Sequence, residues 1–303
     1  MPNINKGLIL ISSTAIISGF SVFINKFGVA TASPDIFTFT KNAAVALALS
    51  AAILFFTGYR KGLMALGRRQ WLKLLLLGLI GGSVPFLLFF KGLALTSAAQ
   101  GAFVHKTMFI FVALMAAAFL KERLNKNFFI GGLLMLTGIL LTLKNWDISF
   151  GLGDGLILLA VLFWSAENIL AKYLLRDLPG TLVAWGRMFF GATILFAYLF
   201  FTGQTAQLLS LNYSQLGWIA ITAVLLLGYV ITWYNGLKFL PVSVAAAILL
   251  LGLPITTLLT AFGTGRLVPQ DIFSGFLIFT GLLVILGIKR FKFANKSLNH
   301  SIT

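Results

Sequence analysis

The sequence predicts an all-α integral membrane protein, with ten transmembrane helices arranged as two inverted five-helix repeats. Three observations lead to this prediction: the composition, the length of the apolar runs and an internal repeat. Of the 303 residues, 59% are hydrophobic and 10% are charged, whereas a soluble domain carries roughly 25% charged residues. A soluble fold of this size cannot hide so much apolar surface, so much of it must face lipid.

The apolar runs set the number of spans, because a spanning helix needs about 20 mostly apolar residues. Ten runs approach this length, the fifth and tenth being short: 7–29, 36–57, 71–93, 97–120, 128–143, 155–175, 181–202, 215–237, 241–263 and 271–288. The first run follows Lys6 and has no clear small-residue cleavage site, so we expect it to remain as a signal anchor.

The distribution of Lys and Arg predicts the orientation. The formal net charge is +16, which in a soluble protein would suggest a nucleic-acid partner. Here the cations lie mostly in short loops on one side of the predicted membrane: Arg60, Lys61, Arg68, Arg69, Lys121, Arg123, Lys126, Arg176, Lys238 and the tail from residue 289. By the positive-inside rule that side, with both termini, faces the cytoplasm. We therefore expect a multi-pass protein of the plasma membrane, with the lipid bilayer and not nucleic acid as its partner.

The second half of the chain repeats the first. Residues 55–58, Phe-Phe-Thr-Gly, recur at 200–203, and Lys91-Gly92-Leu93 corresponds to Asn235-Gly236-Leu237. Lys26 and Lys41 are 15 residues apart, as are Lys172 and Arg187. A unit of five spans is odd-numbered, so its second copy must insert with the opposite orientation, and such inverted halves can exchange an outward-open for an inward-open state.

The repeat defines the domains: 1–146 for the first five-helix unit, 147–288 for the second and 289–303 for a basic cytoplasmic tail. The segments 105–107, 119–124 and 131–138 resemble the fourth helix, acidic loop and fifth helix of the EamA family of the drug/metabolite transporter superfamily. Residues 254–267 and 275–281 match the same block in the second half. The resemblance implies a carrier of small solutes, in a family whose substrates range from amino acids to drugs.

Two features depart from the family pattern. Glu122 is the acidic residue that follows the fourth helix, but its counterpart in the second half is Gly265. Pro254 retains the proline that is common in this helix, whereas the fourth helix has none. The two halves need not act symmetrically.

Ionisable residues inside a span are costly and indicate function. Lys106 lies near the centre of the fourth span, where a lysine costs roughly 2.5–3.5 kcal/mol on insertion scales. It is a candidate to contact the solute or to have its charge gated by a proton; the alternative is a structural ion pair. His105 is its neighbour, about 100° round the helix, and is either a second site residue or a packing histidine.

Glu167 is the acid nearest the centre of any span, and Asn168 lies beside it. We expect either a proton carrier or a fixed partner of Lys106 or Lys172. Trp164, one turn earlier, is a candidate cavity wall or a core residue. Polar and charged residues near the span ends suggest two vestibules, with snorkelling as the alternative: Asn25, Lys26, Lys41, Asn42, Lys172 and Arg187.

Three aromatic residues in the second half of the eighth span are candidates for a role. Tyr229 is deep enough to need a hydrogen-bond partner, whereas Trp233 and Tyr234 are interpreted as an aromatic belt at the membrane edge. Candidate hinges are Gly82 and Pro85 in the third span and Pro254 in the ninth, because proline removes a helical hydrogen bond and glycine permits a kink.

These residues favour a secondary carrier that works by alternating access. The deep and half-deep groups are five cations and one anion: Lys26, Lys41, Lys106, Lys172 and Arg187 against Glu167. We expect the export of a small anionic or zwitterionic metabolite, such as an amino acid. The alternatives are a proton-coupled efflux pump for cationic drugs that uses Glu167, and a non-transporting sensor or assembly protein.

The remaining predictions concern chemistry and assembly. The chain has no cysteine and two histidines, so no metal site and no cofactor are expected. No nucleophile–base set is visible, so the chain is not expected to be an enzyme, and no phosphate-binding loop suggests ATP as a driving force. The fifth and tenth helices have no ionisable residue between their ends and are predicted to form a lipid-facing scaffold or a homodimer surface.

Overall fold

The computed structural model describes residues 2–29, 31–96, 98–143 and 150–287. Throughout this part of the chain the regular structure is helical, with no strand. The predicted basic tail, 289–303, lies outside the described residues, as does most of the junction between the predicted halves.

The first half contains nine helical elements: α1 (Pro2–Val29), α2 (Pro34–Phe55), α3 (Thr57–Met64), α4 (Arg68–Leu77), the π-helix η1 (Gly78–Ser83), α5 (Val84–Leu93), α6 (Ala98–Lys106), α7 (Met108–Leu120) and α8 (Lys126–Leu140). The second half contains seven: α9 (Leu152–Leu174), α10 (Gly180–Phe201), α11 (Ala206–Leu209), α12 (Tyr213–Leu237), α13 (Val242–Leu249), α14 (Gly252–Thr264) and α15 (Pro269–Leu286).

Nine helical segments within the described residues are long and apolar enough to cross a membrane. Each corresponds to a predicted span, so the chain is a multi-pass membrane protein. The predicted fifth span is α8, which has only 15 residues and is shorter than a typical membrane crossing. Three of these spans are interrupted within their length: the third consists of α4, η1 and α5, the fourth of α6 and α7, and the ninth of α13 and α14.

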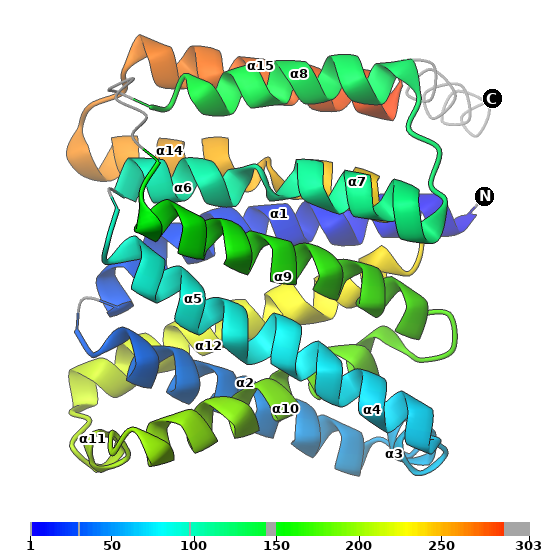
Figure 1. The fold of residues 1–303 in the computed structure, drawn as a ribbon, viewed down its shortest axis with the longest axis vertical. Helices are drawn as coiled ribbons and strands as arrows, with labels where there is room; N and C mark the ends of the chain where they lie inside the picture. The colour runs from blue at the N-terminus through cyan, green and yellow to red at the C-terminus, as the bar shows by residue number, and fades with distance from the viewer. Residues whose placement is uncertain (1, 30, 97, 144–149, 288–303) are drawn as a thin grey trace, which may run out of the picture.

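The spans run side by side in one bundle (Figure 1). At one end of the bundle α1 begins, α15 ends, and the segments between α2 and α4, α7 and α8, α9 and α10, and α12 and α13 gather. We call this the basic end, because it groups the Lys- and Arg-rich loops that the sequence assigned to one side. The other end, with residues 202–212 and 265–268, is the opposite end.

The two halves interleave instead of forming separate bundles. The helix α1 packs on α12, α5 packs on α9, and α2 packs on α10. At one edge α8 and α15 pack against each other (Figure 1). Glycines bring their backbones together there: a Cβ at Gly131 would stand 2.3 Å from the Gly281 carbonyl oxygen, and a Cβ at Gly281 would stand 2.5 Å from that of Gly131. Such small-residue contacts are typical of helix packing in lipid.

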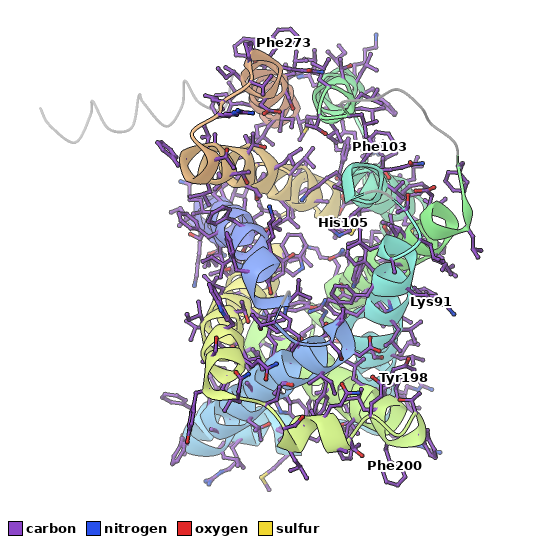
Figure 2. The ribbon with its side chains drawn as sticks, turned by 90° about the vertical axis from the view of Figure 1, so that its left-hand side faces the viewer. Lys91, Phe103, His105, Tyr198, Phe200 and Phe273 are labelled. Atoms are coloured by element: carbon purple, nitrogen blue, oxygen red, sulfur yellow. The ribbon has the colours of Figure 1, made fainter. Side chains whose placement is uncertain are left out.

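Large apolar side chains cover the outside of the bundle. Seen from the opposite end, Phe200 and Phe273 point away from the other helices (Figure 2), and both are more than half exposed. This distribution leaves the polar side chains to meet inside the bundle, as lipid requires.

Candidate functional site

The third span is interrupted where the hinge was predicted. Proline has no N–H, so Pro85 cannot donate to the carbonyl of Gly81 four residues earlier. The backbone adopts the π-helix η1 immediately before this point, and the Ser83 hydroxyl donates to the carbonyls of Gly78 and Leu79, each at 3.1 Å. Gly81 and Gly82 are both buried. The interruption therefore leaves main-chain acceptors open to neighbouring spans.

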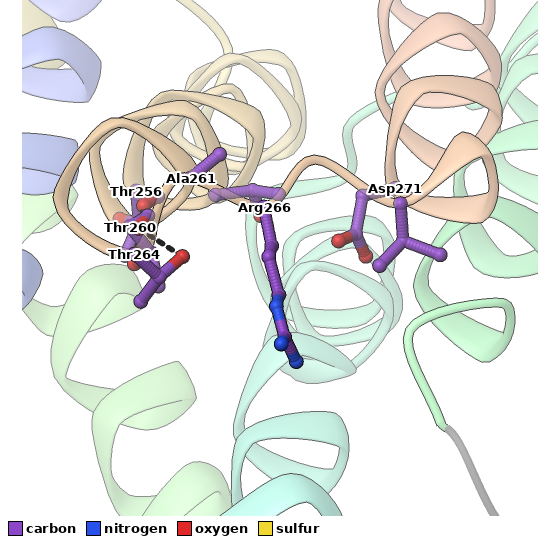
Figure 3. Close-up of a pocket in the computed structure, with 8 residues that line it drawn as sticks. Thr256, Thr260, Ala261, Thr264, Arg266 and Asp271 are labelled. Carbon is purple, nitrogen blue, oxygen red and sulfur yellow. Dashed lines mark hydrogen bonds between the residues drawn. The ribbon is translucent and has the colours of Figure 1, made fainter.

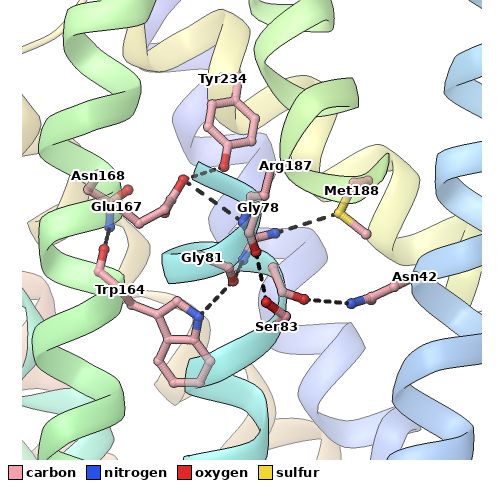
Figure 4. Close-up of polar contacts among 11 residues, drawn as sticks. Asn42, Gly78, Gly81, Ser83, Trp164, Glu167, Asn168, Arg187, Met188 and Tyr234 are labelled. Carbon is pink, nitrogen blue, oxygen red and sulfur yellow. Dashed lines mark hydrogen bonds and ion pairs between the residues drawn. The ribbon is translucent and has the colours of Figure 1, made fainter. Parts of the chain in front are cut away.

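Side chains of three other spans bind these acceptors (Figure 4). The Gly81 carbonyl accepts a 3.0 Å bond from Nη2 of Arg187 on α10 and a 3.1 Å bond from the Trp164 indole on α9. The Gly82 carbonyl accepts a 3.4 Å bond from Nδ2 of Asn42 on α2. Non-helical backbone is tolerated at membrane depth only where neighbouring groups satisfy it in this way.

Glu167, Arg187 and Tyr234 form what we call the buried charge cluster. The Tyr234 hydroxyl donates a 2.5 Å bond to Oε1 of Glu167, and Nε of Arg187 lies 3.9 Å from the same oxygen. The exposed fractions are 3%, 8% and 1% for Glu167, Arg187 and Tyr234. Gly81 makes room for this cluster, because a Cβ there would stand 2.3 Å from Cγ of Glu167.

The cluster corrects two sequence-based interpretations. The ion partner of Glu167 is Arg187, not Lys106 or Lys172. Tyr234 is not part of a membrane-edge belt: it is fully buried and bonded to Glu167. Trp233 is also buried, and its ring stacks on Tyr229 with centroids 6.3 Å apart.

Trp164 connects the interrupted third span to the fourth. Its ring contacts His105 and Phe86 edge-on, each with centroids 5.3 Å apart, while its indole N–H reaches Gly81. His105 is thus one of several packed rings. Asn168 donates to the Trp164 carbonyl at 2.9 Å, and its own Oδ1 has no hydrogen-bond partner among the described residues.

The fourth and ninth spans are both broken at their middle. The helix α6 ends at Lys106 and α7 begins at Met108; the Thr107 hydroxyl donates to the Val104 carbonyl at 2.6 Å. In the ninth span α13 ends at Leu249 and α14 begins at Gly252. Pro254 lies in the first turn of α14 and, because proline has no N–H, it cannot donate to the carbonyl of Leu250, the C-cap of α13.

Lys106 is half-buried at the break in the fourth span. Unlike the arginine of the cluster, it has no hydrogen bond or ion pair with another residue of the described ranges. At this position it is a cation inside a span, and the described residues supply no opposite charge to pair with it.

The predicted vestibule residues separate into different environments. Nζ of Lys172 donates to the carbonyls of Leu237 and Leu240, at 2.6 and 2.7 Å, and thereby caps the end of α12. Nζ of Lys41 donates to Oδ1 of Asn25 at 3.1 Å.

The other vestibule residues differ again. Lys26 is exposed, while Asn42 and Arg187 belong to the contacts around η1. The six residues are not gathered in two vestibules: each half places a cation of its second span against a polar group of its first, Lys41 with Asn25 and Arg187 with Glu167.

Glu122 has a role that the sequence did not predict. Its carboxylate accepts 2.7 and 3.1 Å bonds from the backbone N–H groups of Val242 and Ser243, and a 2.6 Å bond from the Ser243 hydroxyl. It therefore caps α13 and joins the two halves at the basic end. Its counterpart Gly265 cannot do the same at the opposite end.

A cavity of about 750 Å³ lies between α14 and α15 (Figure 3). Its lining residues are Thr256, Thr257, Thr260, Ala261, Thr264, Arg266, Val268 and Asp271. The threonines 256, 260 and 264 are spaced by four, which places them on one helix face. That spacing could have revealed the stripe in the sequence, although not the cavity that it faces.

Comparison with known proteins gives the class of this fold. The profile of the EamA-like transporter family matches twice, at residues 5–144 and 151–287. Uncharacterized transporter YyaM of Bacillus subtilis (strain 168) is 29% identical over 286 residues, or 89% of this chain and 90% of that protein. An uncharacterized transporter in the cobO 3' region of Sinorhizobium sp is 31% identical over 128 residues, which cover 42% of this chain and 89% of that shorter protein.

A protein of known crystal structure has the same fold, with a TM-score of 0.73 and 19% identity, over 91% of this chain and 94% of its own. The broken apolar spans and the internal polar contacts thus define a helical membrane transporter. The chain belongs to the EamA-like transporter family, as the sequence resemblance indicated.

Proposed function

We propose that the protein is a secondary carrier that exports a small anionic or zwitterionic metabolite, such as an amino acid, by alternating access of two inverted five-helix halves. Reciprocal packing supports the inverted arrangement. The first span packs on the eighth, α1 on α12, and the sixth packs on the third, α9 on α5. The first and third spans of one half correspond to the sixth and eighth of the other, so exchanging the halves converts one contact into the other. Alternating access requires two halves that are equivalent in this way.

The observation that carries the proposal is that Lys106 lacks a hydrogen-bond or ion partner among the residues that the structure describes. Of the five cations in or near the spans, Arg187 is paired with Glu167, Lys172 with backbone carbonyls and Lys41 with Asn25, while Lys26 is exposed. Lys106 is half-buried at the helix break and has no partner within the described ranges. A solute carboxylate or phosphate would offset the cost of that charge, about 2.5–3.5 kcal/mol on insertion scales.

The arrangement of Glu167 argues against the cationic-drug alternative. Its carboxylate already accepts a hydrogen bond from Tyr234 and faces Arg187. A drug cation would have to displace that guanidinium from a buried site. We further propose that the basic end faces the cytoplasm of the cell, with the protein in the plasma membrane, because Lys and Arg concentrate at that end.

Uptake by proteoliposomes of the purified protein tests this function. The panel contains amino acids, organic anions and lipophilic cations, each under imposed ion gradients. We expect an anionic or zwitterionic compound to accumulate, Lys106→Met to abolish its transport and Lys106→Arg to retain part of it. Lys91→Met is the matched control, because Lys91 is an exposed cation at the end of α5. Preference for lipophilic cations, or full transport by Lys106→Met, would overturn the proposal.

A further inference from the structure

The cavity between α14 and α15 is a candidate second site. We infer that it is a subsite at the opposite end of the bundle, and that it binds a zwitterion through both its ammonium and its carboxylate. This inference rests on the proposed function, because it assigns a further position to the same solute. It is supported by the chemistry of the lining side chains: α14 contributes threonine hydroxyls, α15 contributes Asp271, and the segment between the two helices contributes Arg266 (Figure 3).

The threonine stripe presents acceptors. A threonine hydroxyl has one proton and two lone pairs. Thr260 donates its proton to the Thr256 carbonyl and Thr264 donates to the Thr260 carbonyl, each at 2.9 Å. The Thr256 hydroxyl lies 2.9 Å from both the Gly19 and Gly252 carbonyls. Since these three protons are used within the protein, the hydroxyl oxygens of Thr256, Thr260 and Thr264 are left to accept hydrogen bonds, which suits a ligand ammonium.

Two opposite charges line the same cavity. Arg266 follows Gly265, which ends α14 in a left-handed conformation with φ of 68°, and Asp271 lies in the first turn of α15. Among the residues that the structure describes, these two side chains form no ion pair with each other or with a third residue. A guanidinium is suited to bind a carboxylate through two hydrogen bonds, and Asp271 adds a charged acceptor for an ammonium. A ligand that carries both groups would engage both.

The cavity offers a solute both a cation and an anion, whereas the break in the fourth span does not. Lys106 offers a cation only, and therefore recognises an anionic group whether or not an amine accompanies it. The α14–α15 cavity would separate amino acids from simple carboxylic acids. The cavity at the opposite end, and not Lys106, would therefore select amino acids over simple carboxylic acids.

Protection of a single cysteine tests the subsite. The chain has no cysteine, so Val268→Cys introduces one thiol at the cavity wall, and its labelling by a hydrophilic maleimide is followed in nanodiscs. The probes are leucine, 4-methylpentanoate, which lacks the amine, and 3-methylbutylamine, which lacks the carboxylate. We expect leucine to protect, and the other two to need concentrations higher by roughly tenfold or more, since each lacks a charged hydrogen-bonding group.

Charge-removing variants test whether leucine protects the thiol by binding Arg266 and Asp271. Arg266→Gln and Asp271→Asn, each combined with the cysteine reporter, should raise the half-protecting leucine concentration by roughly tenfold or more. Lys91→Gln and Asp35→Asn remove an equal charge outside the cavity and should leave it unchanged. If leucine fails to protect, if 4-methylpentanoate protects equally well, or if all four variants behave alike, the subsite is overturned.

Failure of the subsite and failure of the proposed carrier function give different results. Lys106→Met should stop transport and leave protection of the Val268→Cys reporter intact. Loss of protection with normal Lys106-dependent transport would reject the subsite alone. Intact protection without any transport would reject the carrier function alone.

Discussion

Pro85 has no N–H to donate to the carbonyl oxygen of Gly81, and that oxygen accepts hydrogen bonds from Arg187 and Trp164. One main-chain atom thereby joins the third span to the sixth and seventh. The polar group that the proline exposes is satisfied by side chains which themselves need partners in lipid. The interruption and the buried charge cluster are therefore one structural unit.

Replacing Pro85 by alanine should uncouple this unit. The restored N–H can donate to Gly81, so η1 is expected to become continuous α-helix and to compete with Arg187 and Trp164 for the carbonyl. We expect unchanged or higher thermal stability but slower transport, measured by melting in detergent and uptake by proteoliposomes. Pro34→Ala is the control, because Pro34 lies in the first turn of α2, where the alanine N–H would have no helical partner. Normal transport by Pro85→Ala would show that the interruption is not required.

The ion pair of the cluster can be tested by a double-mutant cycle. Removing one partner of a buried pair leaves the other charge uncompensated and costs about 3–5 kcal/mol. We therefore expect Glu167→Gln and Arg187→Gln each to lower the free energy of unfolding, and the double variant to be less destabilised than the sum of the two.

The matched cycle combines Glu167→Gln with Lys172→Gln. Lys172 contacts the carbonyls at the end of α12 and not the carboxylate, so this pair should be additive within about 0.5 kcal/mol. Equal coupling energies in the two cycles, measured by denaturant unfolding in detergent, would contradict the assignment of Arg187 as the partner.

Glu122 should hold the basic end closed. Glu122→Ala removes the acceptor for two backbone N–H groups and the Ser243 hydroxyl, at a cost of about 1–3 kcal/mol. We expect α13 to loosen and the reporter Ala245→Cys, whose side chain is fully buried, to be labelled faster by a hydrophilic maleimide. Arg123→Ala, an exposed neighbour, is the control and should not change the rate. Unchanged labelling in Glu122→Ala would show that the cap is not what keeps this end closed.

The span positions could be predicted because they depend on length and composition alone. A run of apolar residues must be helical and of membrane length wherever it packs, and nine predicted spans have such helices among the described residues. The effect of Pro85 was also predictable, since a proline acts on the carbonyl four residues before it.

Partners across the bundle were not predictable in the same way. The sequence offered Lys106 or Lys172 as a fixed partner of Glu167, but the partner is Arg187 on α10. Choosing it requires the rotation and tilt of two helices. Tyr234 was placed at the membrane edge because its sequence position is near a span end, whereas packing against α9 buries it. The cavity on α14 likewise depends on how that helix is rotated toward its neighbours.

A pair of glycine substitutions tests how tightly η1 packs on α10. A Cβ at Gly82 would stand 2.5 Å from the Arg187 carbonyl oxygen and 2.8 Å from Cα of Gly191. These are backbone atoms, so only movement of a helix can relieve the contact, and overpacking of this kind typically costs about 1–3 kcal/mol.

Gly82→Ala should therefore lower the melting temperature. Gly217→Ala adds the same methyl group on α12 where nothing lies within 4 Å, and should be neutral or stabilising by up to about 1 kcal/mol. Because both variants add one methyl group, the difference between their melting temperatures reports how tightly each position is packed. If Gly82→Ala melts like Gly217→Ala, then η1 can move away from α10 at little cost, and the third span bends at this point as the hinge prediction requires.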